Sequence, residues 1–484
     1  MHGETVFAME PVLCRQQGEI ERDRTGLSSR FLLSGLLGHP RHVQSARVRA
    51  PVEARVGRPT DRRARRKASA MASAIDGKGR GRSVSSVRVR MARGTLVKMK
   101  PQTHVQHSPR GDLAITFSGG GARAAYQVGV LRGLARHVTG PRPVILTGES
   151  AGAINVAYLA AHPGPLPQAI DELARLWSQL TVDQVVRVGP LSLGRNVLRW
   201  GGRLMSGGAP GAPKVRGLLD TAPLRALLEE GLASEDGVIV GIAKNLERGS
   251  LKAIALTTIN FSTGQTVTWV QGSEILDWER PLRRSVRTKL TVDHVLASAA
   301  LPFMFPAVRL GNSWYGDGGV RLHSPLSPAI HLGAQRILAV STRYQPTHEE
   351  ADRPAVYGYP APAQVAGILL DAIFLDLIDQ DALVLERLNR LLGLLPRQEW
   401  GDLRPVDLLV LRPSQDLDKL AAEFESRLPR GIRFLTRGLG GHETSRPALL
   451  SLLMFLPEYL QPLIRIGEAD VEARRDEIRA FLTD

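Results

Sequence analysis

The stretch that most constrains the fold is a sharp turn between an apolar segment, Val144–Leu146, and an almost wholly apolar helix that ends before Pro163. A strand, a tight turn and a helix in this order hold a serine at the corner, where its hydroxyl is presented to a ligand. The glycines of the corner allow strained backbone angles and a close approach of strand and helix. We therefore predict that Ser150 is a nucleophile in an elbow made by Gly148, Glu149, Ala151 and Gly152. Taken alone, a chance glycine turn before a core helix explains the five residues equally well.

A second strand, glycine turn and helix comes earlier in the chain. The apolar run Leu113–Phe117 leads into Gly119, Gly120 and Gly121, and the spacing of the following apolar residues predicts a helix. Three glycines expose backbone amides at the positive end of that helix, where an anion can bind. A dinucleotide pyrophosphate is one candidate, but no acidic residue stands about 20 positions further on to hold its ribose. The oxyanion of an acyl transfer at Ser150 uses both turns and is the favoured hypothesis.

Three motifs in this order resemble the patatin-like phospholipase family. They are Gly-Gly-Gly-Ala-Arg from Gly119 to Arg123, the Ser150 corner, and Asp317-Gly318-Gly319. The resemblance implies an α/β fold of three layers (α/β/α), with a mainly parallel central sheet and a C-terminal helical extension. It also implies hydrolysis of lipid carboxylic esters by a Ser-Asp dyad, in which Asp317 is the partner of Ser150, with no cofactor or metal. Ala124 stands where the family usually has a glycine, which is a small departure.

The implied mechanism assigns a role to each motif. Serine is a weak nucleophile until a base takes its proton, so burial must raise the pKa of Asp317 above the usual value of about 3.9. Amides of Gly119, Gly120 and Gly121, together with Ala151, are expected to hold the oxyanion. Arg123, which belongs to the same turn, would orient it or contact a lipid phosphate; a surface arginine with neither role is the alternative.

Two other functions are compatible with the same residues. In a Ser-His-Asp hydrolase the histidine follows the acid along the chain, and His323 and His331 satisfy that order. A catalytically inactive lipid-binding scaffold is the non-enzymatic alternative, although the presence of both Ser150 and Asp317 argues against it.

Charge is concentrated at the N-terminus. Residues 1–110 contain 23 of the 63 Lys and Arg but only 8 of the 47 Asp and Glu, which accounts for nearly all of the net charge of +16. This segment has no periodicity, and we predict a disordered basic tail. It would be attracted to anionic lipid headgroups, or it is a solvated tail, or it precedes a later start at Met91 or Met99. The rest of the chain is nearly neutral, so no specific nucleic-acid partner is expected.

The ordered chain is expected to comprise a patatin-like catalytic domain at 111–335 and a C-terminal extension at 336–484. The extension completes the sheet with strands at 336–340 and 407–411 and adds helices, including a long one within 367–394. Their apolar stripes are predicted to be core, with a membrane-contacting face as the alternative. Further strands are expected at 238–243, 256–259 and 266–270, and a loop over the site at 186–217. A helix of small residues at 297–302 that ends in an apolar corner at 303–306 is expected to be core packing, with an acyl-chain wall as the alternative.

Targeting signals are not apparent. No stretch reaches the roughly 18 apolar residues of a spanning helix, and the first residues lack the pattern of a signal peptide. A single cysteine, Cys14, fits a reducing compartment. We predict a cytoplasmic protein, with peripheral contact at a membrane surface as an option, whose partner is a lipid or phospholipid substrate. The sequence makes no prediction about the oligomeric state.

Overall fold

The computed structural model describes residues 111–137, 143–187, 198–199, 202, 205, 217–273, 275–352, 377–438 and 448–483. Contacts divide the chain into Met1–Lys100 and Pro101–Asp484, and every described residue belongs to the second unit. The predicted basic tail lies outside the described residues. So do most of the predicted loop at 186–217 and the first ten residues of the helical pattern at 367–394.

The centre of the described unit is a ten-stranded mixed sheet with the strand order β10-β9-β1-β2-β3-β4-β6-β5, to which β8 pairs at β3 and β7 pairs at β8. Neighbouring strands from β10 to β3 are parallel, whereas β3 pairs with β4 and β8 in antiparallel fashion. The strands are β1 (Leu113–Phe117), β2 (Ile145–Glu149), β3 (Ala253–Asn260), β4 (Thr266–Gly272), β5 (Glu279–Arg280), β6 (Arg283–Arg287), β7 (Val308–Leu310), β8 (Ser313–Asp317), β9 (Arg336–Val340) and β10 (Asp407–Leu411). This confirms the expected α/β class with a mainly parallel central sheet.

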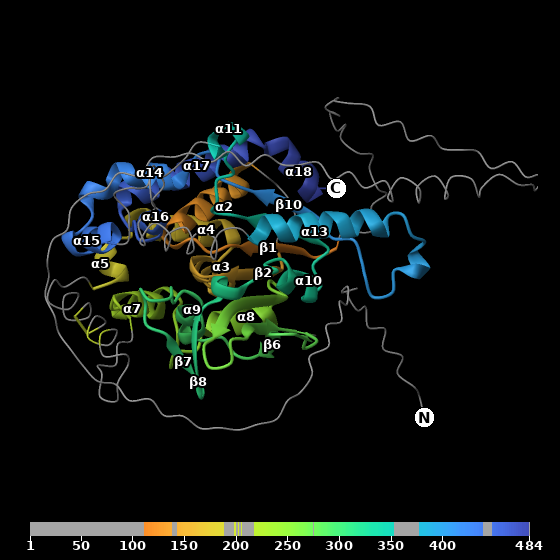
Figure 1. The fold of residues 1–484 in the computed structure, drawn as a ribbon. Helices are drawn as coiled ribbons and strands as arrows, with labels where there is room; N and C mark the ends of the chain where they lie inside the picture. Colours follow the sequence, from red (N-terminus) through yellow and green to blue (C-terminus); the bar gives the residue numbers. More distant parts are fainter. Residues whose placement is uncertain are drawn as a thin grey trace, which may run out of the picture. The chain divides into compact units, whose positions relative to one another are not determined.

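Helices cover both faces of the sheet, which gives the three predicted layers (Figure 1). Along β1, Leu113, Ile115 and Phe117 join one buried cluster and Ala114 joins another, because successive side chains of a strand point to opposite faces. The first cluster includes residues of α2 (Ala125–His137), α3 (Ala151–Ala161), α4 (Leu166–Gln179) and α17 (Pro457–Ala473). The second includes residues of α10 (Ser327–His331) and α13 (Leu377–Leu392).

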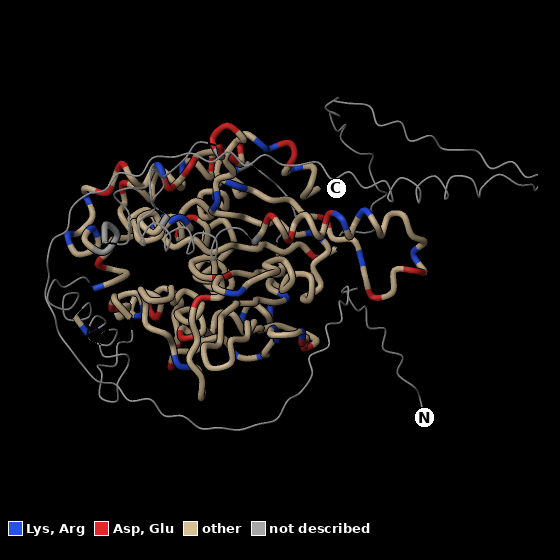
Figure 2. The backbone as a smooth tube through the Cα atoms, in the orientation of Figure 1, with Lys and Arg blue, Asp and Glu red and all other residues tan. Residues whose placement is uncertain are grey.

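The outer helices carry most of the charge, and the central strands are largely uncharged (Figure 2). The C-terminal helical extension is present, and α17 packs along α2. No described helix combines the length and the apolar run that crossing a membrane requires. The remaining helices are α5 (Val182–Val185), α7 (Ala222–Gly231), α8 (Val240–Glu247), α9 (Val292–Ser298), α11 (His348–Ala351), α14 (Leu417–Phe424), α15 (Arg430–Gly438), α16 (Ala448–Leu452) and α18 (Arg475–Thr483), with 3₁₀ turns at Gly121–Ala124, Gly318–Arg321, Arg397–Glu399 and Glu425–Arg427.

One predicted strand is wrong. The segment at 238–243 is predicted to be a strand, but most of it lies in α8. Ile239 and Ile242 are buried and three residues apart, a helical spacing that packs α8 against α3. A Cβ atom at Gly241 would lie 2.0 Å from the Ala161 carbonyl oxygen, so the two helices touch at their backbones. Tertiary packing therefore overrides the local strand preference.

Candidate active site

Ser150 occupies a strained corner between β2 and α3. Its φ and ψ are 53° and −131°, a region that costs a residue other than glycine on the order of 1–3 kcal/mol. The side chain is 8% exposed, and the Ser150 amide donates a hydrogen bond to Ser298 Oγ at 3.1 Å. The hydroxyl itself is left facing a small pocket. This is the backbone arrangement expected of a nucleophile held at the end of a strand.

The glycines of the corner are required by close packing. A Cβ atom at Gly152 would lie 2.6 Å from the Ser118 carbonyl oxygen and 2.7 Å from that of Phe117, and one at Gly148 would lie 2.6 Å from the Gly152 carbonyl oxygen. Real Cβ atoms essentially never come so close to backbone oxygens. The strand and the helix therefore approach as closely as the sequence indicated.

We expect Gly152→Ala to lower the free energy of unfolding by about 1–3 kcal/mol, because the added methyl group must push β1 away from α3. Urea denaturation would measure the change. Gly231→Ala is the matched control, since a Cβ atom there has no heavy atom within 4 Å. Alanine is the better helix former at both positions. Equal midpoints for the two variants would contradict the crowding at Gly152.

Asp317 lies at the end of β8, two strands away from the Ser150 corner. β3 stands between them: Thr257 is in register with Glu149 of β2, and Thr258 is in register with Asp317. The carboxyl group is completely buried, and its Oδ1 accepts a hydrogen bond from the Gly319 amide at 2.9 Å. Among the described residues Oδ2 has no hydrogen-bond partner of standard geometry. One lone pair of this carboxylate is therefore available.

Burial raises the pKa of Asp317 to about 7, while the Ser150 side chain and the Gly319 amide, which both face the carboxyl group, oppose the shift. No hydrogen bond of standard geometry joins the two side chains in the described structure. The structure thus brings the two residues of the predicted dyad together. Asp317 ends β8 and caps the 3₁₀ turn at Gly318–Arg321.

Glu149 is a second buried carboxyl group whose role the sequence did not indicate. Its side chain is 6% exposed, Oε1 accepts a hydrogen bond from the Gly119 amide at 3.4 Å, and Oε2 has no partner among the described residues. Burial, and secondarily the charge of Asp317, raises its pKa to about 8. Glu149 is therefore mainly protonated at neutral pH. A glutamate ending an otherwise apolar strand was the available signal.

The glycine turn presents two unpaired amides to the pocket. Gly120 and Gly121 have φ angles of 150° and 53°, and no described residue accepts a hydrogen bond from either amide. The Ala151 amide, at the first position of α3, is likewise unpaired within the described chain. Gly120, Gly121, Ser150 and Ala151 line one cavity of about 40 Å³. The Gly119 amide is bound to Glu149, so the donors available to an oxyanion are those of Gly120, Gly121 and Ala151.

Arg123 supports the glycine turn from behind. The side chain is 1% exposed, Nη1 forms an ion pair with Asp418 of α14 at 2.9 Å, and Nε donates to the Gly120 carbonyl oxygen at 3.5 Å. This geometry corresponds to the expected orienting role. The two other interpretations, a lipid-phosphate contact and a free surface arginine, do not fit a buried and paired guanidinium.

A serine that sequence analysis did not single out links the Ser150 corner to β3, the strand that pairs with β8 and Asp317. Ser298, at the end of α9, is completely buried; its Oγ accepts from the Ser150 amide and donates to the Thr257 carbonyl oxygen at 2.7 Å. Two residues later, the Ala300 carbonyl oxygen accepts from the Asp317 amide at 3.1 Å. The small residues of this segment were predicted only as core packing or as part of an apolar corner.

The histidines of the alternative triad lie elsewhere. His323 and His331 are exposed, and the His331 ring stacks on Trp278 at 4.8 Å. No histidine lines the cavity at Ser150 in the described part of the chain. The structure therefore does not bring either histidine to the candidate nucleophile. The described residues also contain no cluster of His, Cys, Asp and Glu that could hold a metal ion.

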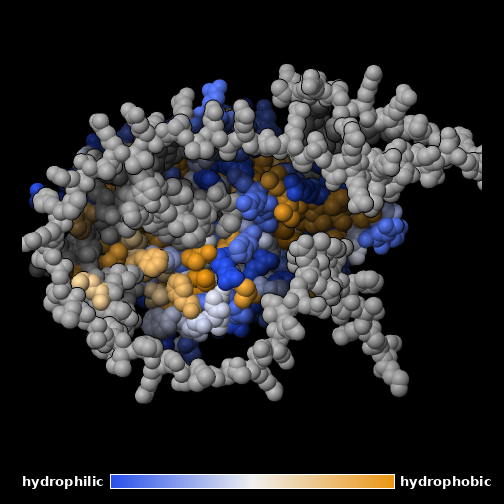
Figure 3. Space-filling model, in the orientation of Figure 1, coloured by the Kyte–Doolittle hydropathy of each residue, from blue (hydrophilic) through white to orange (hydrophobic). Residues whose placement is uncertain are grey.

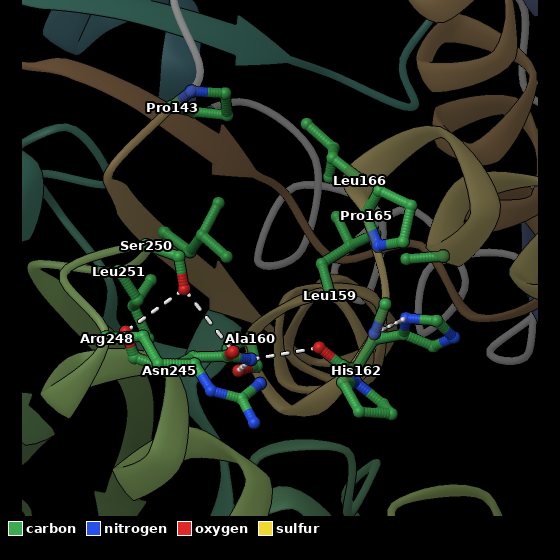
Figure 4. Close-up of a pocket in the computed structure, with 14 residues that line it drawn as sticks. Pro143, Leu159, Ala160, His162, Pro165, Leu166, Asn245, Arg248, Ser250 and Leu251 are labelled. Atoms are coloured by element: carbon green, nitrogen blue, oxygen red, sulfur yellow. Dashed lines mark hydrogen bonds between the residues drawn. The ribbon is translucent and has the colours of Figure 1, made fainter.

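A separate cavity of about 240 Å³ lies at the other end of β2 and α3 (Figure 4). Its polar groups are engaged in finishing α3: Asn245 Nδ2 donates to the carbonyl oxygens of Ala160 and His162 at 2.8 and 3.0 Å, and Ser250 Oγ donates to Asn245 Oδ1. His162 Nδ1 accepts from the Gly164 amide at 3.0 Å. These contacts satisfy the last carbonyl groups of a helix, which otherwise lack partners. We therefore assign this cavity a structural role.

Comparison with known proteins is consistent with the resemblance. Residues 115–330 match the family model of patatin-like phospholipase, a span that contains the Ser150 corner and Asp317. No curated protein matches the chain.

Several solved structures are similar at low identity. Human GIVD cytosolic phospholipase A2 is 13% identical with a TM-score of 0.39, covering 77% of this chain and 62% of that one. VipD from Legionella pneumophila is 12% identical with a TM-score of 0.26, covering 63% of this chain and 62% of that one. ExoU in its complex with SpcU, from the type III secretion system of Pseudomonas aeruginosa, is 16% identical with a TM-score of 0.23, covering 83% of this chain and 86% of that one. The chain thus spans about three fifths of the first two proteins.

Proposed function

We propose that this chain, which matches the patatin-like phospholipase family over residues 115–330, is a lipid acyl hydrolase that cleaves carboxylic esters through an acyl-enzyme. Ser150 is the nucleophile and Asp317 is its base. The observation that supports this best is the buried Asp317 carboxyl group, which has an unpaired oxygen and faces the hydroxyl of a serine at a strained corner.

In the first half of the reaction, Asp317 accepts the proton of Ser150 Oγ as this oxygen attacks the ester carbonyl carbon. The tetrahedral oxyanion is held by the amides of Gly120, Gly121 and Ala151, each of which typically contributes about 10²- to 10³-fold in rate. When the C–O bond to the alcohol breaks, Asp317 returns the proton to the leaving oxygen. Water then attacks the acyl-enzyme in the same way and releases the fatty acid.

The raised pKa of Asp317 suits this role. A carboxylate with a pKa near 4 is a poor base for a serine hydroxyl, whereas one near 7 is still substantially ionised at neutral pH and binds a proton more strongly. Arg123 and Glu149 hold the glycine turn on either side through Gly120 and Gly119, so its unpaired amides are fixed before substrate arrives.

Labelling with a fluorophosphonate tests the proposal directly. We expect a single covalent adduct, located on Ser150 by peptide mass spectrometry, and release of free fatty acid when the protein is incubated with a mixed lipid extract. Binding of lipid without an adduct and without fatty acid release would instead identify an inactive lipid-binding scaffold. The lipid classes that lose an acyl chain in the same incubation would define the substrate.

We expect His323→Ala and His331→Ala each to retain at least about half of the wild-type kcat/KM for ester hydrolysis, since neither side chain lines the cavity at Ser150. His331→Ala removes the stacking on Trp278, so its thermal midpoint should be measured alongside its activity. A loss of about 10²-fold or more in a correctly folded histidine variant would require the triad mechanism in place of the dyad.

A further inference from the structure

The small cavity at Ser150 borders a much larger one. The larger cavity, of about 510 Å³, lies between α3, α4, α5 and α7, and it shares Ala151, Ile154 and Leu224 with the small one. Figure 3 shows apolar surface on this face in the region of α7 and α9. Cavities of this size are typical of sites for small organic molecules. The space between α4 and α7 is therefore the neighbouring volume that a ligand at Ser150 would reach past Ala151, Ile154 and Leu224.

The larger cavity is apolar along its length. Leu173, Trp177 and Leu180 of α4 face Leu228 of α7, and Phe455 contributes from the C-terminal part of the chain. The buried polar group at its wall has a partner, since Trp177 Nε1 donates to Asn155 Oδ1 at 2.8 Å. Of the other polar side chains among the described lining residues, those of Gln179, Gln184 and Glu230 are exposed. A wall that is apolar in its buried part fits a hydrocarbon better than a headgroup.

A cavity on the other side of α7 has the opposite character. It measures about 390 Å³ and shares Leu224, Ala299 and Phe305 with the cavity at Ser150. Arg225, which is paired with Asp293, and Arg309 contribute to its wall. An ester joins an apolar acyl chain to a more polar alcohol. Of the two cavities that border the one at Ser150, one is likewise mainly apolar and the other carries charged side chains.

We propose that the cavity between α4 and α7 binds the acyl chain of the substrate and that it selects long acyl chains. The proposal rests on the proposed role of Ser150. Each methylene group removed from water contributes about fourfold to binding, so an apolar cavity of about 510 Å³ favours a long chain over a short one. The apolar corner at 303–306, which the sequence offered as an acyl-chain wall, contributes only Phe305 at the junction, and Phe303 is 60% exposed.

Gly231→Trp tests this assignment by filling the cavity. Gly231 lines it near the end of α7, and a Cβ atom there has no heavy atom within 4 Å, so a side chain can start from this position without a clash. With p-nitrophenyl esters, the ratio of kcat/KM for palmitate to that for butyrate should fall by at least about tenfold. Leu176→Arg, at a 44% exposed position of the same wall, should lower the ratio in the same direction.

Leu383→Trp is the matched control, because Leu383 is 52% exposed on α13, which packs on the other face of the sheet. Its ratio should equal that of the wild type. An unchanged ratio in both cavity variants, or an equal fall in the control, would overturn the proposal.

A binding measurement separates this proposal from the proposed reaction. Fluorescence of cis-parinaric acid, a long-chain fatty acid, should rise on mixing with the Ser150→Ala protein, and Gly231→Trp in the same background should weaken binding at least about tenfold. If the wild type hydrolyses no ester but fatty acid still binds saturably and Gly231→Trp weakens that binding, the acyl-chain cavity is supported and the hydrolase function is rejected. Ester hydrolysis with no such binding and an unchanged chain-length ratio would reject the cavity alone.

Discussion

Replacing Ser150 with alanine should lower kcat/KM for lipid ester hydrolysis by at least about 10⁴-fold, because no other hydroxyl is held at the strained corner to form the acyl-enzyme. Release of free fatty acid from mixed vesicles, followed under initial-rate conditions, measures the loss. The fold should be unaffected, since the Ser150 side chain makes no capping hydrogen bond to α3 and the alanine keeps the same backbone angles.

Ser178→Ala provides the matched control. It removes an exposed hydroxyl that bonds only to the Arg175 carbonyl oxygen in the preceding turn of α4, and its activity should equal that of the wild type. If Ser150→Ala keeps more than about a hundredth of the wild-type rate and a normal thermal midpoint, then Ser150 is not the nucleophile and the proposed reaction is wrong.

Asp317→Asn should also lower kcat/KM by about 10⁴-fold, because an amide cannot take the serine proton. The amide oxygen can still accept the Gly319 hydrogen bond, so the turn should keep its shape. In the wild type, kcat/KM should rise with pH through about 7, as Asp317 loses its proton. A pH profile without this limb, or an active Asn variant, would show that Asp317 is not the base.

The same substitution should change stability in the opposite direction to activity. Folding raises the pKa of Asp317 from near 4 to about 7, so the folded protein binds this proton more tightly than the unfolded chain does. Asp317 therefore lowers the free energy of unfolding progressively as the pH rises from about 4 to about 7. Asn carries no charge at any pH. Asp317→Asn should therefore be more stable than the wild type at pH 8 and no more stable at pH 3, as measured by urea denaturation at both values.

The core of the fold could be predicted where burial leaves a simple pattern. β1, β9 and β10 were placed within their observed bounds, because strands of a parallel sheet covered on both faces are short continuous apolar runs. β7 and β8 were not predicted as strands. They are short and partly exposed, with Trp314 43% exposed, and they are held by pairing with each other and with β3. Such pairing is invisible in a local pattern.

In the candidate site, too, local features could be predicted from the sequence and contacts between distant segments could not. The Ser150 corner could be recognised from neighbouring residues alone, because its geometry is produced by the strand, the glycines and the helix that adjoin it. The partnership with Asp317 depends on β3 lying between two strands that are far apart in sequence, so only the family resemblance suggested it. The contacts of Glu149 with Gly119 and of Ser298 with Ser150 arise from tertiary packing and could not be predicted from spacing.

Ser298 and Ala300 lie two residues apart, and the first accepts a hydrogen bond from the Ser150 amide while the second accepts one from the Asp317 amide. The candidate nucleophile and the candidate base are thus both hydrogen bonded, through their backbone amides, to one short peptide at the end of α9. Leu301 and Phe305, which follow this peptide, line the cavity at Ser150. A ligand in that cavity that displaced the peptide would therefore move Ser150 and Asp317 together.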